Sequence, residues 1–549
     1  MKRWDPLAIP YYLMVGLLAY FVILPVAGVV LYGAFPFESL QYLLESAGRS
    51  LPFLGRSLFI AFFVTGFSVA VGLAASIALW RFEFRGRRLL RYAMVLPMIN
   101  PPFVGSIAFI MLFGKRGLIT HALLGLSVSP FGWVGIAVME ILSLSALAYL
   151  IISSSVVKID TSIEDAARNL GTPEPVIFRD ITLRSMAPEI SAAAVLVFLA
   201  SMADFGTPLI IGGAYQTLAS DLYIQITGLY DMRSAAVSGT LLLLPCMLLF
   251  AVQRRLVKKK NYYAMGIANP DIVYRHYSRP LRRVLTGMAG LYGFMVTMKY
   301  LFIVIGAFTR QWGYDYAPTL FHMRTVLERD FSPFLNSIQL AFFSAFFASM
   351  AGVLLSYMIK RKDFRLKRTA DLVATLPAAV PGILMGVGYL VAFKYPIMGI
   401  GRFWMREMPP LILLGTGIII YLICIFRYMN VGLRTGYALL EHLNPNIEEA
   451  ARNLGQTEGK IFSEIALPLM APAFGSAFFK NFSTTMTTLG AIIFLLLPSN
   501  KVAVQQIFQI ITSSAMGVAA AMALLLSLVT AVMLAVFRII NAKLLRIKQ

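Results

Sequence analysis

Twelve apolar runs, separated by shorter polar segments, recur along the whole chain. Each run has about the 20 residues that a helix needs to cross a hydrocarbon layer of ~30 Å. A helix satisfies its own backbone hydrogen bonds in lipid, so the pattern predicts an all-α polytopic membrane protein with about twelve transmembrane helices. The runs lie near residues 7–34, 53–79, 92–113, 133–154, 191–212, 234–252, 284–308, 334–359, 370–393, 410–430, 471–497 and 512–537.

The distribution of Lys and Arg predicts the orientation of these helices. If the N-terminus is cytoplasmic, the inner segments hold 34 of the 48 Lys and Arg residues and the outer loops hold 12. Cytoplasmic loops collect Lys and Arg, so this bias predicts that both termini lie inside the cell. The first run has no clear small-residue cleavage site and is longer than a signal-peptide core, so we expect a retained helix.

Composition agrees with a membrane protein and excludes two other classes. Of the 549 residues, 58% are hydrophobic and 13% are charged, which is about half the charged share of a soluble domain. A soluble enzyme and a disordered chain are therefore excluded. The net charge of +22 would suggest nucleic acid in a soluble protein, but unbalanced Lys and Arg in cytoplasmic loops explain it here. We expect membrane lipid as a partner and no nucleic acid.

A duplicated polar segment is the most informative feature of the sequence. Residues 163–171 read Ile-Glu-Asp-Ala-Ala-Arg-Asn-Leu-Gly, and residues 447–455 match them at eight of nine positions, at an offset of 284. The match continues without a gap to Met186-Ala187-Pro188 and Met470-Ala471-Pro472. Both copies occupy the same place among six apolar runs, which predicts two parallel six-helix repeats with a pathway between them.

The repeat also predicts the domain boundaries. An offset of 280 aligns the earlier part of each half, for example Leu96-Pro97 with Leu376-Pro377. A basic segment, predicted to be cytoplasmic, separates the two copies. The predicted first unit, linker and second unit are residues 1–252, 253–283 and 284–549.

Each duplicated segment lies in the predicted cytoplasmic loop between the fourth and fifth runs of its half. In residues 164–170, early acids and strong helix formers favour a short helix whose acids lie near its N-terminus. Gly171 and Gly455 then supply a helix stop or a tight turn. We expect in each loop a short helix, a glycine break and a second amphipathic helix that leads into the membrane. Loops usually vary more than cores, so two nearly identical polar loops indicate a shared partner surface.

At these residues the chain resembles the coupling loop of bacterial ABC importer permeases. The first copy reads Asp165-Ala166-Ala167, Gly171 and Ile181-Thr182-Leu183-Arg184. The second reads Glu449-Ala450-Ala451, Gly455 and Ile465-Ala466-Leu467-Pro468, and it matches the family pattern fully. The resemblance covers nearly the whole chain and implies a type I ABC importer permease fold in the bacterial inner membrane.

The same resemblance implies two partners. A dimer of ATPase subunits would dock on the cytoplasmic loops and would bind the ATP and Mg, and a solute-binding protein would dock outside. The residues that the resemblance places at the ATPase are Glu164, Asp165, Ala166, Ala167, Gly171, Glu448, Glu449, Ala450, Ala451 and Gly455.

A narrower resemblance concerns the solute. Four stretches are similar to fused permeases of ferric-iron uptake systems, namely Leu96-Pro97, 101–105, 113–120 and 203–208. Ferric iron is therefore the solute that we expect. Related permeases carry thiamine, polyamines such as spermidine and putrescine, or 2-aminoethylphosphonate, and these solutes stay open as alternatives.

The sequence has no catalytic or metal-binding pattern. A phosphate-binding loop is missing, since Leu454 stands where the first Gly before Lys460 would have to be, so the ATPase must be another chain. Asp204-Phe205-Gly206 shares only its letters with the magnesium triplet of kinases. The four histidines and the two cysteines, Cys246 and Cys424, show no ligand spacing, and no cofactor is expected on this chain.

Ionisable residues inside apolar runs are candidates for the solute pathway. Asp204 lies in the fifth run of the first half, and Thr488 is its counterpart in the second half. Lys480 has Leu196 as its counterpart, so the two halves differ there. Two interpretations are open for each of these three residues: a transient contact with the solute, or a polar contact with another helix. Glu140 and Lys299 are more typical of a helix end or a helix partner.

Two classes of function fit this pattern: the permease of an ATP-driven importer, and a secondary transporter, which can also have twelve helices in two halves. Secondary transporters usually carry their coupling acids and substrate site inside the bundle. This chain instead concentrates its repeated polar pattern in cytoplasmic loops. A membrane enzyme would need a catalytic cluster, which the sequence lacks, so the sequence favours the importer permease, which is not itself an enzyme.

Overall fold

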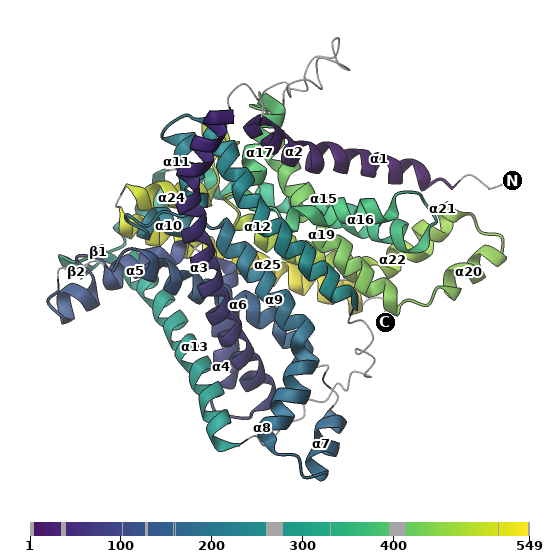
Figure 1. Cartoon of the computed structure of the whole chain (residues 1–549), viewed down its shortest axis with the longest axis horizontal. Coiled ribbons are helices and arrows are strands. Elements are labelled where there is room, and N and C mark those ends of the chain that lie inside the picture. The colour runs from purple at the N-terminus through teal and green to yellow at the C-terminus, as the bar shows by residue number, and fades with distance from the viewer. Residues whose placement is uncertain are drawn as a thin grey trace.

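The computed structural model describes residues 5–34, 40–100, 103–126, 130–156, 159, 161–259, 278–329, 331–394, 413–513 and 515–546. Helices make up almost all of these residues. They form two bundles that diverge like the arms of a V (Figure 1). Helices α3, α6 and α9 belong to the first arm, and helices α15, α19 and α22 belong to the second.

The first half contains twelve of the described helices. Four short stretches with other helical geometry lie between or beside them: η1 (Ala19–Ile23), η3 (Leu96–Ile99), η4 (Leu118–Leu123) and η5 (Phe178–Thr182). The helices are α1 (Ala8–Leu18), α2 (Leu24–Ala34), α3 (Leu40–Arg81), α4 (Arg87–Val95), α5 (Val104–Phe113), α6 (Trp133–Val156), α7 (Thr161–Asn169), α8 (Glu174–Ile177), α9 (Leu183–Ala203), α10 (Gly206–Ile211), α11 (Leu218–Thr227) and α12 (Met232–Lys259).

The second half repeats this order and adds a small antiparallel hairpin on strands β1 (Thr309–Gln311) and β2 (Asp315–Pro318). The apolar pattern did not predict the hairpin, because each strand is only three or four residues long. The helices are α13 (Arg279–Ala307), α14 (Phe321–Arg329), α15 (Ser332–Arg361), α16 (Lys367–Thr375), α17 (Gly382–Lys394), α19 (Ile418–His442), α20 (Asn446–Asn453), α21 (Glu458–Lys460), α22 (Leu467–Leu469), α23 (Ala471–Met486), α24 (Ala503–Thr512) and α25 (Met516–Arg546).

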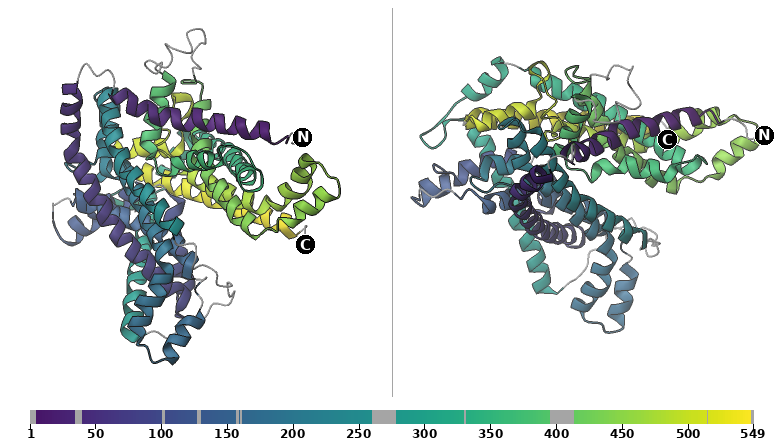
Figure 2. Two further views of the ribbon diagram at one scale, coloured as in Figure 1. Left: turned by 45° about the vertical axis from the view of Figure 1, so that its right-hand side comes forward. Right: turned by 45° about the horizontal axis from the view of Figure 1, so that its top comes forward.

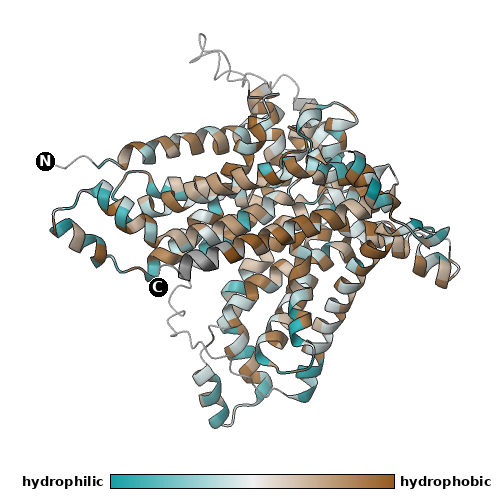
Figure 3. Ribbon diagram, turned by 180° about the vertical axis from the view of Figure 1, so that it is seen from behind, coloured by the Kyte–Doolittle hydropathy of each residue, from teal (hydrophilic) through white to brown (hydrophobic). Residues whose placement is uncertain are grey.

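The number of membrane helices agrees with the prediction. Ten helices in the described part of the chain are long and apolar enough to cross a membrane, and two bent helix pairs raise the number to twelve. Each of the twelve predicted runs overlaps one of these elements. Apolar residues cover the middle of the helices and polar residues gather at their ends (Figure 3), as expected for segments that pass through a hydrocarbon layer.

Two of the predicted runs are broken near equivalent prolines of the two halves. The run near 92–113 is broken into α4, a 3₁₀ turn at Leu96–Ile99 and α5, because Pro97 begins a new turn and cannot continue an α-helical ladder. The equivalent break in the second half is at Pro377, where the helices before and after it are bent by 111°.

The fifth helix of each half begins and ends earlier than predicted. The predicted run 191–212 corresponds to a span over Glu174–Ala203, and the run 471–497 corresponds to Glu458–Leu469 followed by Ala471–Met486. The amphipathic starts of these helices were not counted as apolar by the sequence pattern. Each fifth helix therefore reaches directly into the duplicated polar segment of its half.

The first helices of each half pack against the other half. Helix α2 packs against α17, and α13 packs along α3, α4 and α5. The views agree that α1 and α2 lie on the arm built mainly by the second half (Figures 1 and 2). Hydrogen bonds fix the crossings, for example from Tyr11 Oη to Arg365 O at 2.9 Å and from Tyr292 Oη to Leu142 O at 2.9 Å. A cut at 253–283 therefore separates the repeats in sequence but not the two arms in space.

The predicted linker, residues 253–283, is helical at both ends. Helix α12 extends to Lys259 and helix α13 begins at Arg279. Residues 260–277 lie outside the described residues.

Candidate functional site

The duplicated segments form two helical loops, which we call the first polar loop (161–182) and the second polar loop (445–466). Each loop consists of a short helix, α7 or α20, a turn at a glycine, and a further helical stretch that leads into the fifth helix. This order confirms the prediction of a short helix, a glycine break and a second helix. Helices α7 and α20 lie at the far ends of the two arms (Figure 1).

The two glycine turns have the same backbone geometry. Gly171 has φ +77° and Gly455 has φ +84°, a left-handed conformation that glycine adopts without a steric penalty. The amide of Thr172 donates to Ala167 O at 3.1 Å, and the amide of Gln456 donates to the equivalent carbonyl of Ala451 at 3.1 Å. This hydrogen bond, together with one from each glycine amide to the carbonyl three residues earlier, is the Schellman pattern that ends a helix.

An ion pair closes each turn at equivalent positions. Arg168 Nε lies 2.7 Å from Glu174 Oε1, and Arg452 Nε lies 2.7 Å from Glu458 Oε1. The hydrogen bond to the carboxylate raises the pKa of each guanidinium above its ordinary value. The pairing joins the helix before the glycine to the helix after it, so each polar loop is a preformed unit.

The leading acids of the two loops face the body of the protein. Glu164 is buried and lies 3.6 Å from Arg81 Nη1, while Thr182 Oγ1 donates to it at 2.8 Å. Glu448 Oε1 lies 3.4 Å from Arg361 Nε in the equivalent position. Both carboxylates therefore hold the loop helices on their own half. Whether Glu164 and Glu448 also contact a partner stays a prediction.

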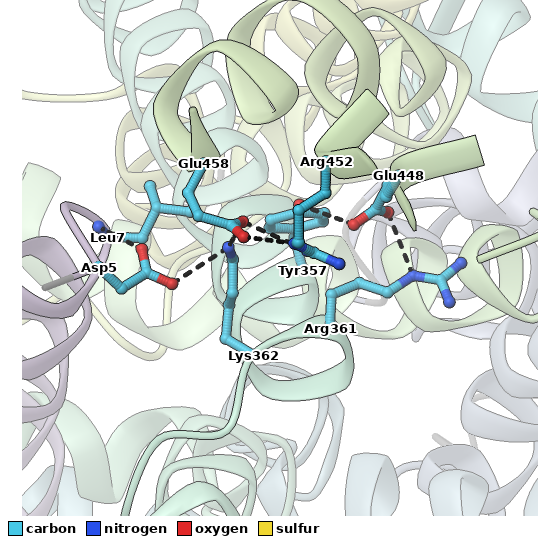
Figure 4. A network of polar contacts seen from close by, with 8 residues as sticks. All are labelled: Asp5, Leu7, Tyr357, Arg361, Lys362, Glu448, Arg452 and Glu458. Carbon is cyan, nitrogen blue, oxygen red and sulfur yellow. Dashed lines mark hydrogen bonds and ion pairs between the residues drawn. The ribbon is translucent and has the colours of Figure 1, made fainter. Parts of the chain in front are cut away.

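The second polar loop has a larger network than the first (Figure 4). Tyr357 Oη donates to Glu448 at 3.0 Å, and the Lys362 ammonium contacts both Glu458 and Asp5, the latter at 3.1 Å. The counterpart of Lys362 in the first half is Phe82, which has no charge. The start of the chain is thus tied to the second loop by a bridge that the first half lacks.

The outward face of each loop helix is a pair of exposed apolar and small residues beside an acid. Leu170 and Leu454 are 86% and 84% exposed. Ala166 and Ala450 are also exposed, whereas Ala451 is buried and Ala167 is partly buried. Asp165 pairs with Arg168 at 2.8 Å, and Glu449 is exposed. These exposed residues are not covered by the half that carries the loop.

The carboxylate of Asp204, a predicted pathway residue, accepts hydrogen bonds from nearby backbone amides. Its Oδ1 accepts hydrogen bonds from the amides of Gly206 at 3.0 Å and Thr207 at 3.2 Å, and its Oδ2 accepts one from Thr207 Oγ1 at 2.6 Å. These bonds fix the turn between α9 and α10. Its counterpart Thr488 accepts a hydrogen bond from Tyr428 Oη at 2.7 Å. Both residues therefore hold helix junctions.

The other ionisable residues in the membrane helices have different surroundings. Glu140 is buried and accepts a hydrogen bond from Ser201, and Lys299 is buried with its Nζ 5.1 Å from the ring centroid of Tyr300. These contacts agree with a packing role for both. Lys480 is exposed on α23, and no ion pair or side-chain hydrogen bond holds its ammonium within the described part of the chain.

Five aromatic rings meet where the two halves touch. Phe103, Phe205 and Tyr223 come from the first half, and Phe494 and Phe508 come from the second. The ring of Phe508 lies 5.7 Å from that of Phe103, 5.9 Å from that of Phe205 and 6.0 Å from that of Tyr223. Phe494 lies 6.1 Å from Tyr223. We call these five residues the aromatic seal, because they fill the contact between the halves with apolar groups.

The pattern of two helical loops at the ends of two arms agrees with a comparison with protein families. The model of the binding-protein-dependent transport system inner membrane component matches residues 66–261 and again residues 337–546. The chain belongs to this family. The permease therefore contains two copies of the family domain, and each copy includes one polar loop.

Individual relatives support the same assignment. The permease is 29% identical to the ferric transport system permease protein FbpB of Actinobacillus pleuropneumoniae, over 85% of this chain and 68% of the relative. It is also 29% identical to a putative ferric transport system permease protein, FbpB 1, of Haemophilus influenzae, over 81% of this chain and 70% of the relative. A shorter match, 26% identical over 36% of this chain and 73% of the relative, is to the sulfate transport system permease protein CysT of Salmonella typhimurium.

Sequence reasoning missed the residues that hold the polar loops of the permease in place. Arg81 and Arg361 stand at the 280 offset, and Arg168 and Arg452 stand at the 284 offset, so both pairs repeat in the sequence. A search for charged residues that repeat outside the loops would have found the first pair. Tyr357 and Thr182 could not be found in this way, because their counterparts are Ile77 and Ala466.

Proposed function

We propose that this permease is the membrane subunit of an ATP-driven importer and that its cargo is ferric iron. Its partners are a dimer of ATPase subunits at the two polar loops and a solute-binding protein on the other side of the membrane. The observation that carries the proposal is the shared geometry of the two loops: the same glycine turn and the same 2.7 Å ion pair occur twice, at the ends of two arms. A symmetric pair of docking units suits a partner that is itself a dimer.

The arrangement supports a rocking mechanism. The halves touch at the aromatic seal, while α7 and α20 lie at the far ends of diverging arms (Figure 1). ATP binding by the partner draws its two subunits together, and the polar loops follow because ion pairs fix each loop to its own half. Closing the arms at the loops then opens the seal, and the binding protein releases solute between the halves. Such a cycle requires each partner to bind one of the two states more tightly.

This mechanism places both termini and both polar loops in the cytoplasm. It assigns ATP hydrolysis to the partner and no enzymatic activity to this chain. The excess of Lys and Arg on the predicted inner side supports this orientation.

Ferric iron is favoured over the other solutes by the relatives. Three relatives that each match more than four fifths of this chain are named as ferric or Fe(3+) transport system permeases. Among the described residues there is no group of three or more His, Cys, Asp or Glu side chains that could hold a metal ion. A permease that receives iron from a binding protein needs only transient contacts, so this finding is compatible with the proposal.

Uptake of labelled ferric iron tests the function. Cells that carry this chain with its own ATPase and binding protein should accumulate iron, and deletion of the chain should abolish the accumulation. Unchanged iron uptake, with loss of thiamine, polyamine or 2-aminoethylphosphonate uptake, would reject iron and retain the importer. If the uptake that depends on this chain continues after ATP is removed, a secondary transporter would be favoured instead.

A further inference from the structure

The fifth helices, α9 and α23, run along the two arms to one common point. Helix α9 leads from the first polar loop to Phe205, and α23 leads from the second polar loop toward Gly490. These two ends meet, because a Cβ atom built on Gly490 would lie 3.3 Å from Phe205 Cε1. The polar loops lie at the ends of diverging arms (Figure 1). Helices α9 and α23 are therefore the two sides of the V, and they converge at the aromatic seal.

One face of α23, continued by Thr487 directly after the helix ends, carries four polar residues. Ser476 and Lys480 are exposed, and Thr484 and Thr487 are partly exposed. Their spacing of three or four residues puts them on one helix face. We call these four residues the α23 stripe. The opposite residues of α23, such as Phe482 and Asn481, are buried where the helix packs against α15 and α19.

The equivalent face of α9 is apolar. At the offset of 284 the counterparts of the α23 stripe are Ala192, Leu196, Ala200 and Ala203. Leu196 is exposed and the three alanines are partly exposed, so this face of α9 is also uncovered by its own half. The two helices thus share an uncovered face, but this face is polar on α23 and apolar on α9.

The α23 stripe lies on a different side of the helix from the aromatic contacts that α23 makes with α15. Phe474 and Phe478 of α23 meet Phe346 and Phe342 of α15, which are exposed rings on the apolar outside of the arm. At 100° per residue, Lys480 points away from both Phe474 and Phe478. An ammonium in hydrocarbon is costly and would select a polar or water-filled side. The cost of placing Lys480 in lipid therefore favours a stripe that faces the space between the two arms.

Lys480 gives this side an uncompensated positive charge. No ion pair holds its ammonium among the residues that the structure describes, and the nearest stripe residues are hydroxyls. The acid that was expected in the pathway, Asp204, is engaged by the amides of Gly206 and Thr207. A free Fe³⁺ ion would be repelled by such a wall, whereas an anionic group would be attracted and could accept hydrogen bonds from the hydroxyls.

We propose that the α23 stripe is a specificity element of the solute pathway and that the cargo passes Lys480 as an anionic, oxygen-rich species. This inference rests on the proposed function and adds the chemical form of the cargo. Two sources share this chemistry: ferric iron that keeps its anionic oxygen ligands, and a free oxyanion. The hydroxyl groups and the single ammonium group of the stripe can bind each of these anions transiently. They do not form a closed shell of ligands that would hold the anion in place.

The charge of the wall is tested first, without any solute. Thr484→Cys places a thiol one helical turn from Lys480, about 6 Å between Cβ atoms. We use the assembled complex in membranes whose cytoplasmic side is accessible to the reagents. This thiol should react faster with an anionic than with a cationic methanethiosulfonate. Adding Lys480→Met should lower the ratio of the anionic to the cationic reaction rate by roughly five- to tenfold, as expected for a unit charge at this distance in water. Ala200→Cys with Leu196→Met is the matched control on α9, and its ratio should not change.

The buried native thiols, Cys246 and Cys424, provide the blank, since the unmodified chain should react slowly with both reagents. A ratio that is insensitive to Lys480→Met, or a thiol at 484 that neither reagent reaches, would overturn the proposal. Neither result depends on the identity of the solute.

Transport then separates the two sources. The complex with its own ATPase and binding protein is given ⁵⁵Fe with ¹⁴C-citrate, ³²P-phosphate or ³⁵S-sulfate. We expect ⁵⁵Fe to enter together with ¹⁴C, Lys480→Met to slow entry at least fivefold, and Lys480→Arg to keep most of the rate. Entry of phosphate or sulfate alone, with the same dependence on Lys480, would support the stripe and reject iron as the cargo. Iron import that is unchanged by Lys480→Met, or uptake confined to a cationic solute such as a polyamine, would overturn the inference.

Discussion

Arg361 Nε lies 3.4 Å from Glu448 Oε1, and the same guanidinium donates to the Leu443 carbonyl at 2.7 Å. One side chain thus joins the end of α15, the end of α19 and the helix of the second polar loop. The first half repeats the ion pair with Arg81 and Glu164 at 3.6 Å. The acids of the duplicated motif therefore join each loop helix to its own arm, and other residues of the same helix are exposed.

Replacing these arginines should uncouple the loops without unfolding the membrane helices. Arg81 and Glu164 are buried, and breaking a buried ion pair costs about 3–5 kcal/mol because the remaining charge stays buried without its partner. The partly exposed pair of Arg361 and Glu448 should cost less. Arg361→Met and Arg81→Met should each release a loop helix from its arm and reduce co-purification of the ATPase subunits by at least tenfold. Lys367→Met is the control, since Lys367 pairs with the fully exposed Asp363. Normal ATPase binding in the Arg81/Arg361 double variant would show that the loops do not need this anchor.

The glycine turns give a second test of the loops. No atom outside the turn lies within 4 Å of a Cβ built on Gly171 or Gly455, so the backbone conformation decides the effect of a side chain there. A non-glycine residue in the left-handed region costs about 1–2 kcal/mol. Gly455→Val should therefore lower transport strongly with normal membrane insertion, and Gly171→Val should have a smaller effect because the second copy carries the full motif.

Asparagine tolerates the left-handed conformation, so Gly455→Asn should restore much of the transport that Gly455→Val loses. Gly459→Ala, in the helical stretch of the same loop, should have little effect, since the added Cβ would be 3.9 Å from Pro6 Cγ. Wild-type uptake and ATPase binding in a Gly171→Val/Gly455→Val double variant would refute the role of the turns.

The sequence predicted the elements that depend on long apolar runs and on exact repetition. Twelve runs correspond to twelve possible spans, and the loop order of helix, glycine and helix is confirmed in both halves. Hydropathy could not predict the helix breaks at Pro97 and after Ala203, because the residues on both sides of each break are equally apolar. Nor could it predict that Glu164 is buried: the acid that resembles a partner contact is satisfied by Arg81, which lies 83 residues earlier in the chain.

Packing of the first helix of each half on the opposite arm was also beyond the sequence pattern. Tyr11 reaches Arg365 and Tyr292 reaches Leu142 through single hydrogen bonds to carbonyls, and a carbonyl partner leaves no trace in the sequence. Asp204 shows the same limit. An acid in an apolar run suggests a pathway contact, but its hydrogen bonds to two following amides make it a turn residue.

The orientation of the permease is open to direct labelling. Thr172→Cys and Gln456→Cys place a thiol just after each glycine turn. If both polar loops are cytoplasmic, neither thiol should react with an impermeant reagent added to whole cells, and both should react after the cells are opened. Tyr314→Cys, at an exposed position in the β1–β2 hairpin that we expect outside, should react in whole cells. Rapid labelling at 172 or 456 in whole cells would overturn the orientation and the assignment of the ATPase site with it.

The aromatic seal predicts a variant in which the two halves separate at the seal even when no binding protein is present. Phe508 contacts Phe103, Phe205 and Tyr223, and aromatic pairs of this kind contribute about 0.5–1.5 kcal/mol each beyond their buried area. Phe508→Ala should weaken the state in which the halves touch at the seal. A loss of about 1.4 kcal/mol would shift the equilibrium tenfold toward the opened seal.

In the opened state the two polar loops are close together, so ATP hydrolysis by the assembled complex should rise severalfold in the absence of binding protein. Phe347→Ala, an exposed ring on α15 away from the other half, is the matched control and should leave basal hydrolysis unchanged. Basal hydrolysis at the wild-type level in Phe508→Ala, with normal assembly, would show that these rings do not hold the halves together.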